Sequence, residues 1–359
     1  MRIEFYAAIK TAEPFLPAGT VIAREQTYVH TFYKKEATAQ QPATSKEEGN
    51  LVAFSGPDFK ATFDKQSGLL TSYLYKKHEY ILNGQGPRPF FWRAPTDNDY
   101  GANLPVRLKA WKEASYQEPK AESFQVTPGS NATTIKVTYR FPQTDARWDI
   151  TYKIYASGVI KVDNRFVAER RPSSDDTACG PADAVAGKLY RLDLLRSRSE
   201  RELPRPPYLP VHRRVRHPGQ GYVRAVCPPT GEQPSHGHLL VAPLPIRRNV
   251  VCCSIADRTF ELNTSNYPLE SMDSGDTIDN SAPRTEKTHH RHLTDPLPEK
   301  MVDLFIDYRM MGVGGDDSWG ATAHEPYLIR PGKENAIEYG FSLVPFDKKE
   351  DYKYLIRQY

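Results

Sequence analysis

The sequence predicts an all-β protein whose main part is one large antiparallel β-sandwich. Aromatic residues make up 11% of the 359 residues, with 21 Tyr and 15 Phe, and this bias favours sheets. Apolar and polar residues alternate in many short runs between turn-forming residues, as half-buried strands require. Strands do not alternate with long helices, so the sequence encodes neither a TIM barrel nor a Rossmann sheet.

The first two predicted strands, Ile3–Ile9 and Val21–Phe32, stand apart from the rest. Two strands cannot form a stable sandwich by themselves, so residues 1–33 are interpreted as the last strands of a domain that begins upstream. Residues 34–50 contain no large apolar residue and are expected to form an exposed linker.

The main domain is predicted to span residues 51–346, and a C-terminal tail follows at residues 347–359. Its chain is expected to turn sharply at Lys65–Gly68 and at Ser157–Gly158, where glycine permits the backbone conformation of a turn. One short amphipathic helix is predicted at Arg107–Tyr116. The predicted strands of this domain are Phe59–Phe63, Leu69–Tyr75, Thr134–Phe141, Trp148–Tyr155, Val159–Phe166, Met301–Tyr308 and Ala336–Val344.

The net charge of +4 is carried by one segment of the chain. Between residues 170 and 250, 14 Lys and Arg stand against 7 Asp and Glu, so the remainder of the chain is net acidic. No aromatic stripe accompanies these basic residues, as single-stranded nucleic acid would require. No apolar run approaches the ~18 residues of a membrane helix, and residues 1–5 lack the apolar region of a secretory signal. We therefore expect neither a nucleic-acid nor a membrane partner, and assign no compartment.

The cysteines and histidines do not predict a metal site. The cysteines show neither CxxC spacing nor histidine partners at ligand spacing. His289, His290 and His292 lack a carboxylate or cysteine at ligand spacing and are interpreted as ordinary strand residues. The sequence thus predicts no metal and no cofactor in this chain. The cysteines are Cys179, Cys227, Cys252 and Cys253.

The segment Phe90–Gly101 is the first distinctive motif. After a proline it places Asp97, Asn98 and Asp99, whose side chains bond to nearby backbone N–H groups and tolerate unusual backbone angles. Its residue types, with Arg93 before the proline, favour a structural loop over a ligand or metal loop. The spacing of an EF-hand and its terminal glutamate are absent.

The segment Met311–Ala321 is the second motif and the best candidate for ligand binding. Its glycines allow a tight turn, and Trp319 is an unusually large residue for such a position. Sugars bind through their C–H faces on aromatic rings, while carboxylates and hydroxyls take the sugar hydroxyl groups. Asp316, Asp317 and Ser318 stand beside Trp319 and could supply these groups. A core tryptophan that closes a β-turn explains the residues alone equally well.

Together the motifs resemble the small-chain domain of glycoside hydrolase family 2 β-galactosidases. The two motifs occur in this order and about 215 residues apart. The resemblance covers most of the chain except residues 170–255. Further matching segments are Asn263–Pro268, His290–Leu293 and Ile306–Tyr308, while Ala23–Gln26 resembles the end of the preceding immunoglobulin-like domain.

The resemblance implies a fold, a sugar-binding site and the absence of the catalytic residues from this chain. The fold is a large β "supersandwich" similar to galactose mutarotase, and Trp319 would be a platform for the sugar in the active site. The catalytic glutamate pair of this retaining family lies in an upstream TIM barrel, and no Glu of this chain matches it. The chain alone is therefore expected to be inactive. The resemblance also implies that divalent cations and sodium are bound mainly through the barrel and that the parent enzyme belongs to the bacterial cytoplasm or periplasm.

Residues 170–255 match neither the family nor the β pattern. Residues 170–250 contain 12 of the 30 prolines and neither Phe nor Trp, which is unsuitable for an interior sheet. We hypothesise that this stretch is translated one nucleotide out of frame. Codons for Asp193–Ser199 can be chosen so that the next frame reads Thr-Tyr-Tyr-Gly-Arg-Gly-Pro, which is similar to the family, and residues 222–232 allow a comparable match. We expect residues 170–255 to be irregular and poorly packed.

Two other functions remain open from the sequence. The first is a separate β-sandwich that binds carbohydrate without turning it over. The second is a mutarotase-like enzyme, which needs an acid and a base facing the sugar. His324 with Glu325 is the only nearby candidate for that pair.

Overall fold

The structure is a computed structural model that divides into two compact units, one up to residue 38 and one from residue 39. Within the residues that it describes, no helix is long and apolar enough to cross a membrane. The described residues are 2–28, 41–168, 190–195, 249–253, 261–265, 267–273, 301–317, 320–329, 331–332 and 335–346.

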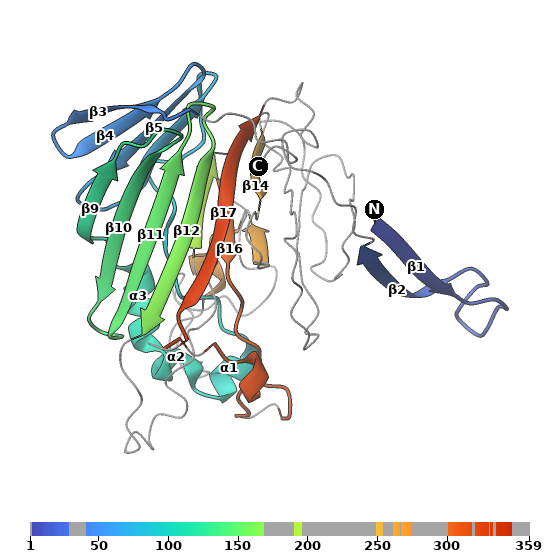
Figure 1. Cartoon of the computed structure of the whole chain (residues 1–359). Coiled ribbons are helices and arrows are strands. Elements are labelled where there is room, and N and C mark those ends of the chain that lie inside the picture. Colours follow the sequence, from blue (N-terminus) through green and yellow to red (C-terminus); the bar gives the residue numbers. More distant parts are fainter. Residues whose placement is uncertain are drawn as a thin grey trace. The chain divides into compact units, whose positions relative to one another are not determined.

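The first unit is a β-hairpin. Strand β1 (Arg2–Ala8) pairs antiparallel with β2 (Val21–Tyr28), in a register that sets Arg2 opposite Tyr28. These strands lie where the sequence predicts them (Figure 1). Phe5 and Ile22 are more than half exposed, so within the described unit these apolar side chains lack cover.

The second unit is built around a six-stranded antiparallel sheet (Figure 1). Its strand order is β14–β17–β12–β11–β10–β9. Long runs of alternating apolar and polar residues form its centre, because successive side chains of a strand point to opposite faces. The strands are β9 (Ala121–Thr127), β10 (Thr133–Phe141), β11 (Ala146–Ile154), β12 (Ile160–Ala168), β14 (Asn249–Cys253) and β17 (Ile337–Phe346).

Two smaller antiparallel sheets complete the described β structure. Five strands follow one another in chain order, and four strands pair in the order β15–β16–β13–β8. The five are β3 (Thr44–Glu48), β4 (Leu51–Ser55), β5 (Phe59–Asp64), β6 (Leu70–Tyr75) and β7 (His78–Glu79). The four are β8 (Arg88–Pro89), β13 (Tyr190–Leu195), β15 (Glu261–Ser265) and β16 (Met301–Asp307).

The smaller sheets pack face to face with the large one. Phe63 of β5 contacts Tyr152 of β11 with ring centroids 5.1 Å apart. The Tyr339 hydroxyl of β17 donates to the Ile306 carbonyl of β16 over 3.2 Å. Burial and Asp307 raise the pKa of Tyr339 well above its ordinary value, so this donor stays protonated. These contacts confirm the predicted antiparallel β-sandwich.

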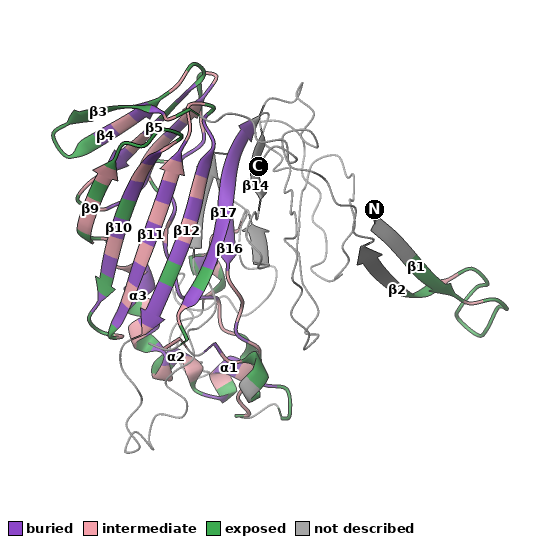
Figure 2. Ribbon diagram, viewed as in Figure 1, coloured by how far each residue is buried: buried purple, intermediate pink, exposed green. Residues whose placement is uncertain are grey.

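Aromatic side chains fill the core between the sheets. The ring of Phe91 is fully buried and contacts Trp111, Phe141, Trp148 and Phe166 at centroid distances of 4.9–5.5 Å. Edge-to-face and tilted pairs of this kind stabilise a core beyond simple burial. Figure 2 shows buried and partly exposed residues alternating along β10 and β11. The segment that precedes the first motif's proline is therefore fixed by the core.

Short helices cluster at one end of the large sheet in Figure 1. The helix predicted at Arg107–Tyr116 is confirmed from Lys109 onward as α3, whereas Arg107 is the last residue of α2. The helices are α1 (Asp97–Gly101), α2 (Leu104–Arg107), α3 (Lys109–Tyr116), and the 3-10 helices η1 (Leu269–Met272) and η2 (Glu325–Tyr327).

Two expectations differ from the structure. Thr44–Glu48, expected within a linker, is strand β3, because main-chain pairing with β4 suffices even though all five residues are exposed. Tyr190–Leu195 and Asn249–Cys253, expected to be irregular, are strands that pair with β16 and β17. The rest of the segment at 170–255 and residues 347–359 lie outside the described residues.

Candidate functional site

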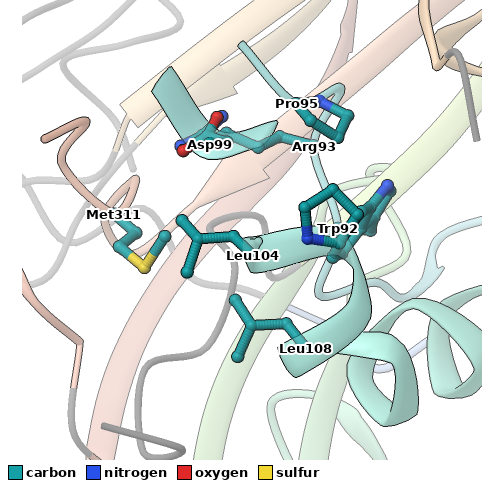
Figure 3. A pocket seen from close by; sticks show the side chains of 8 residues that line it. Trp92, Arg93, Pro95, Asp99, Leu104, Leu108 and Met311 are labelled. Carbon is teal, nitrogen blue, oxygen red and sulfur yellow. The ribbon is translucent and has the colours of Figure 1, made fainter. Parts of the chain in front are cut away.

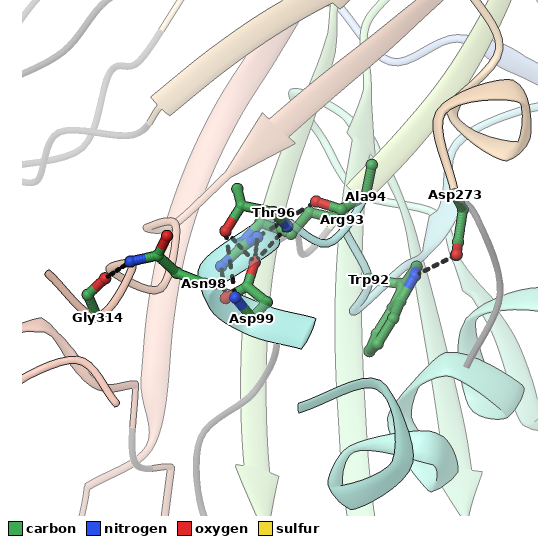
Figure 4. Close-up of polar contacts among 8 residues, drawn as sticks. All are labelled: Trp92, Arg93, Ala94, Thr96, Asn98, Asp99, Asp273 and Gly314. Atoms are coloured by element: carbon green, nitrogen blue, oxygen red, sulfur yellow. Dashed lines mark hydrogen bonds and ion pairs between the residues drawn. The ribbon is translucent and has the colours of Figure 1, made fainter. Parts of the chain in front are cut away.

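The two motifs meet in space although they are far apart in sequence. The side-chain amide of Asn98 donates to the Gly314 carbonyl over 2.6 Å (Figure 4). It also donates to the Asp317 carbonyl over 3.3 Å. Gly320, near the end of the second motif, also lies close to Gly101, the last residue of the first. A Cβ atom at position 320 would be 3.5 Å from the Gly101 carbonyl oxygen. The structure therefore joins both motifs in one site.

The last five residues of the first motif form the short helix α1, where the sequence suggested a loop throughout. Thr96 is the N-cap of α1: its hydroxyl accepts from the Asp99 N–H, and the Asp99 carboxylate accepts from the Thr96 N–H over 2.7 Å. This reciprocal capping box satisfies N–H groups that a helix leaves unpaired at its start. A threonine followed three residues later by an acid was the signal available in the sequence.

A buried ion pair holds the capping box in place. The guanidinium of Arg93 binds both carboxylate oxygens of Asp99, at 2.9 Å for one pair, and both side chains are buried. Two parallel charge-assisted hydrogen bonds of this kind fix the geometry as well as the charge. The neighbouring Asp97 is exposed and takes no part in this pair. Arg93, Asp99 and Asn98 thus form one connected set.

Trp92 is anchored separately, on the other side of Arg93 (Figure 4). Its indole N–H donates to the Asp273 carboxylate over 2.8 Å, and Lys112 pairs with the same carboxylate at 3.1 Å. The Lys112 ammonium also lies 5.4 Å from the centre of the Trp92 ring. The polypeptide before Arg93 is therefore fixed by contacts that do not involve the second motif.

A pocket separates the first motif from the start of the second. Its lining is mainly apolar, and the Arg93–Asp99 pair forms its polar part (Figure 3). Met311, the first residue of the second motif, is buried there near Leu104 and Leu108. Met311 therefore fixes the start of the second motif, called the glycine loop below (residues 311–321), to the core.

The second motif is held by its own backbone contacts. The carboxylate of Asp317 accepts from the N–H groups of Gly320 and Ala321, both over 2.9 Å. A Cβ atom on Gly314 would overlap the Ala321 carbonyl oxygen, so the two arms of the loop nearly touch. Ser318 and Trp319, both predicted to bind substrate, lie outside the described residues, so their side chains are not placed.

Asp316 and His324 join the ends of the same loop. The Nε2 atom of His324 lies 2.5 Å from the Asp316 carboxylate, and both side chains are exposed. This hydrogen bond and the Asp316 charge raise the pKa of His324 above its ordinary 6.5. A raised pKa means that the pair stabilises the fold fully below the unfolded-state pKa and loses that contribution as pH rises through the folded-state pKa. The effect on stability is small because water screens exposed pairs.

Replacing Asp316 by asparagine is expected to lower the pKa of His324 toward 6.5, because the charge that favours the imidazolium is removed. An NMR titration of the His324 ring measures this shift. Asp97→Asn is the matched control, since Asp97 is also an exposed acid but belongs to the first motif, and its replacement should leave the titration unchanged. An unaltered His324 pKa in Asp316→Asn would contradict the pairing.

Other candidates from the sequence fare differently. His324, proposed with Glu325 as an acid–base pair, is bound to Asp316, and the Glu325 side chain is not described. His289, His290, His292, Cys179 and Cys227 lie outside the described residues. Among described residues, no cluster of three His, Cys, Asp or Glu side chains could hold a metal ion. The contacts of Asn98 and the pair between Asp316 and His324 were not foreseen from the sequence.

A protein-family model described as "Beta galactosidase small chain" matches residues 55–191 and 245–343. Residues 192–244 are unmatched, a shorter gap than the 170–255 that the sequence suggested. The chain is similar to "Beta-galactosidase" of Priestia megaterium, with 25% identity over 81% of this chain and 26% of the relative. It is also similar to "Beta-galactosidase" of Streptococcus thermophilus, with 24% identity over 96% of this chain and 32% of the relative.

A shorter relative aligns over nearly its whole length. "Beta-galactosidase small subunit" of Latilactobacillus sakei is 24% identical over 81% of this chain and 95% of that protein. By contrast, the chain spans about a quarter to a third of the Priestia and Streptococcus proteins. The family match covers both motifs of the site and most of the described β-sandwich.

Proposed function

Since the chain belongs to the β-galactosidase small-chain family, we propose that it completes the galactoside site of a β-galactosidase of glycoside hydrolase family 2. The observation that carries this proposal is the joining of the two family motifs through Asn98. That junction builds a glycine loop with exposed carboxylates at the rim of a rigid sandwich. A loop on a rigid scaffold is the usual place for a binding residue.

The loop is proposed to act as a sugar platform. Trp319 would receive the C–H face of a galactosyl ring, while Asp316, Asp317 and Ser318 would lie near its hydroxyl groups. Asp316 and Asp317 are exposed, so their outer oxygen atoms remain accessible to a ligand while each holds its partner in the loop. These contacts position a sugar and do not break its glycosidic bond.

The bond-breaking groups are proposed to come from another part of the enzyme. Retaining hydrolysis needs two carboxyl groups about 5–5.5 Å apart, one as nucleophile and one as acid and base. Of the four acids in the two motifs, Asp99 is bound to Arg93, Asp317 to backbone N–H groups, and Asp316 to His324. The fourth, Asp97, is exposed, and one carboxyl group cannot fill both roles. This chain alone is therefore expected not to hydrolyse galactosides.

The test compares the chain alone with the chain produced together with the polypeptide encoded immediately upstream, using o-nitrophenyl β-D-galactoside. We expect hydrolysis only from the combination, because the catalytic carboxylates come from the second part. Trp319→Ala should then raise KM about 5- to 10-fold, as removal of an aromatic platform contact does. Hydrolysis by the chain alone, or an upstream frame without a catalytic barrel, would overturn the proposal.

A separate carbohydrate-binding protein is the second candidate, and the exposed carboxylates of the loop are the observation that favours it. Calorimetry with methyl β-D-galactoside distinguishes the two. Binding by the chain alone would support the separate binding protein, and absence of binding would support the partial enzyme. A mutarotase-like activity is disfavoured because Asp316 already occupies His324.

A reading-frame change remains our proposal for the unmatched segment at 192–244. It is supported by the proline and arginine content of that segment and by the loss of the family match there. Resequencing the DNA in independent isolates tests it. A single intact frame that encodes the same residues in each isolate would exclude it.

A further inference from the structure

We infer that Asn98 is a positioning residue, which sets the backbone conformation of residues 314–317 and 320–321 on either side of the proposed sugar platform. The inference rests on the proposed function, because it concerns the same sugar platform. It goes further by assigning to the first motif a role in galactoside affinity. The contact that carries it is the side-chain amide of Asn98 on the Gly314 and Asp317 carbonyls.

The backbone of Asn98 is fixed by the structure of helix α1. It lies in α1, between the N-cap Thr96 and Asp99, and the capping box fixes the first turn of that helix. Asp99 is bound to Arg93, which follows directly after the core-anchored Trp92. Asn98 therefore presents its amide from a rigid base.

The two carbonyls that Asn98 binds lie at the start and the end of residues 314–317. Gly314 is buried, whereas Asp317 is exposed near the tip. Asp317 in turn accepts from the N–H groups of Gly320 and Ala321. The backbone on both sides of residues 318 and 319 is thus fixed by a chain of hydrogen bonds that begins at Asn98.

The chemistry of this contact requires an amide at position 98. An aspartate there would have no N–H to donate and would set a negative charge against two carbonyl oxygens. Glutamine keeps the donor but moves it by one methylene group, so Asn98→Gln should rescue part of the contact. Asp97→Asn is the matched control, because residue 97 belongs to the same helix and is exposed.

The experiment uses the full chain and two readouts of the loop. Hydrogen exchange of the Gly320 and Ala321 amides should accelerate about 10-fold in Asn98→Ala and Asn98→Asp, as expected from the loss of ordinary hydrogen bonds. Acrylamide quenching of Trp319, isolated by difference from the same variants carrying Trp319→Phe, should increase. Asn98→Gln should give intermediate values, and Asp97→Asn should match the native protein.

A purely structural role of Asn98 would give a different pattern. The amides of Tyr100 and Ala102, which are bonded within α1, would then accelerate together with those of the loop. That result, or unchanged exchange of the loop amides, would overturn the inference.

Kinetics of the combined enzyme separate this inference from the proposed function. If Asn98 positions the platform, Asn98→Ala should raise KM for o-nitrophenyl β-D-galactoside and leave kcat nearly unchanged. The same substitution should have no further effect in the Trp319→Ala background. If Trp319→Ala leaves KM unchanged while Asn98→Ala still loosens the loop, the platform fails and the positioning stands. If Trp319→Ala raises KM and Asn98→Ala does not, the positioning fails and the platform stands.

Discussion

Replacing Arg93 by alanine is expected to lower the free energy of unfolding by about 3–5 kcal/mol, the range for breaking a buried ion pair from one side. The substitution leaves the Asp99 carboxylate buried and without the guanidinium that binds both of its oxygens. Water cannot replace that partner without opening the site. Urea denaturation of the full chain, followed by tryptophan fluorescence, measures the loss.

Arg140 supplies the matched control for this prediction. It pairs with Glu122 at 2.7 Å, but both side chains are nearly half exposed. Arg140→Ala should therefore cost no more than about 1 kcal/mol, the range for surface ion pairs. Equal losses from Arg93→Ala and Arg140→Ala would contradict the importance of burial at the first motif.

The loss of the Arg93 side chain should also weaken the hydrogen bonds between the first motif and the second. Asp99 holds the first turn of α1 through the capping box, and Asn98 reaches the glycine loop from that turn. An Asp99 carboxylate that turns toward water would release the Thr96 N–H and loosen the helix start. Faster exchange of the Ala321 amide in Arg93→Ala would report this connection.

The strands could be predicted wherever burial on one face imposes a period of two residues. Strand β11 alternates buried and partly exposed residues along its whole length, and its sequence alternates in the same way. Strand β3 escaped prediction because all its side chains are exposed and only main-chain pairing with β4 defines it. Helix α1 escaped because a five-residue helix has too few residues to show a helical period.

The site could be predicted as two motifs but not as one structure. Residue types placed Arg93 and Asn98 in a structural loop and Asp317 in a sugar-binding motif. Nothing in the sequence predicts the contact between Asn98 and Gly314, which are 216 residues apart. That contact depends on how the sheets bring the ends of distant strands together. The His324–Asp316 pair shows the same limit at short range, because the segment between the two residues contains Gly320, which permits many backbone conformations.

Replacing Gly314 by alanine is expected to open the glycine loop, whereas Gly315→Ala should leave it closed. A Cβ atom at position 314 would overlap the Ala321 carbonyl oxygen and lie 3.0 Å from the Thr322 carbonyl carbon, so the backbone must move. At position 315 the same atom would have no neighbour within 4 Å. Overpacking of this kind costs about 1–3 kcal/mol, and a change at an open surface position costs less than about 0.5 kcal/mol.

The two variants place the same methyl group at adjacent positions. Unequal effects would therefore show that the close approach of Gly314 to Ala321 matters, and not the loss of a glycine as such. Gly314→Ala should accelerate exchange of the Gly320 and Ala321 amides and raise KM of the combined enzyme about 5- to 160-fold, the equivalent of that overpacking cost. Gly315→Ala should match the native protein in both measurements. Equal increases in KM from both variants would contradict this prediction. Galactoside affinity would then depend on the flexibility of the loop and not on the packing of Gly314 against Ala321.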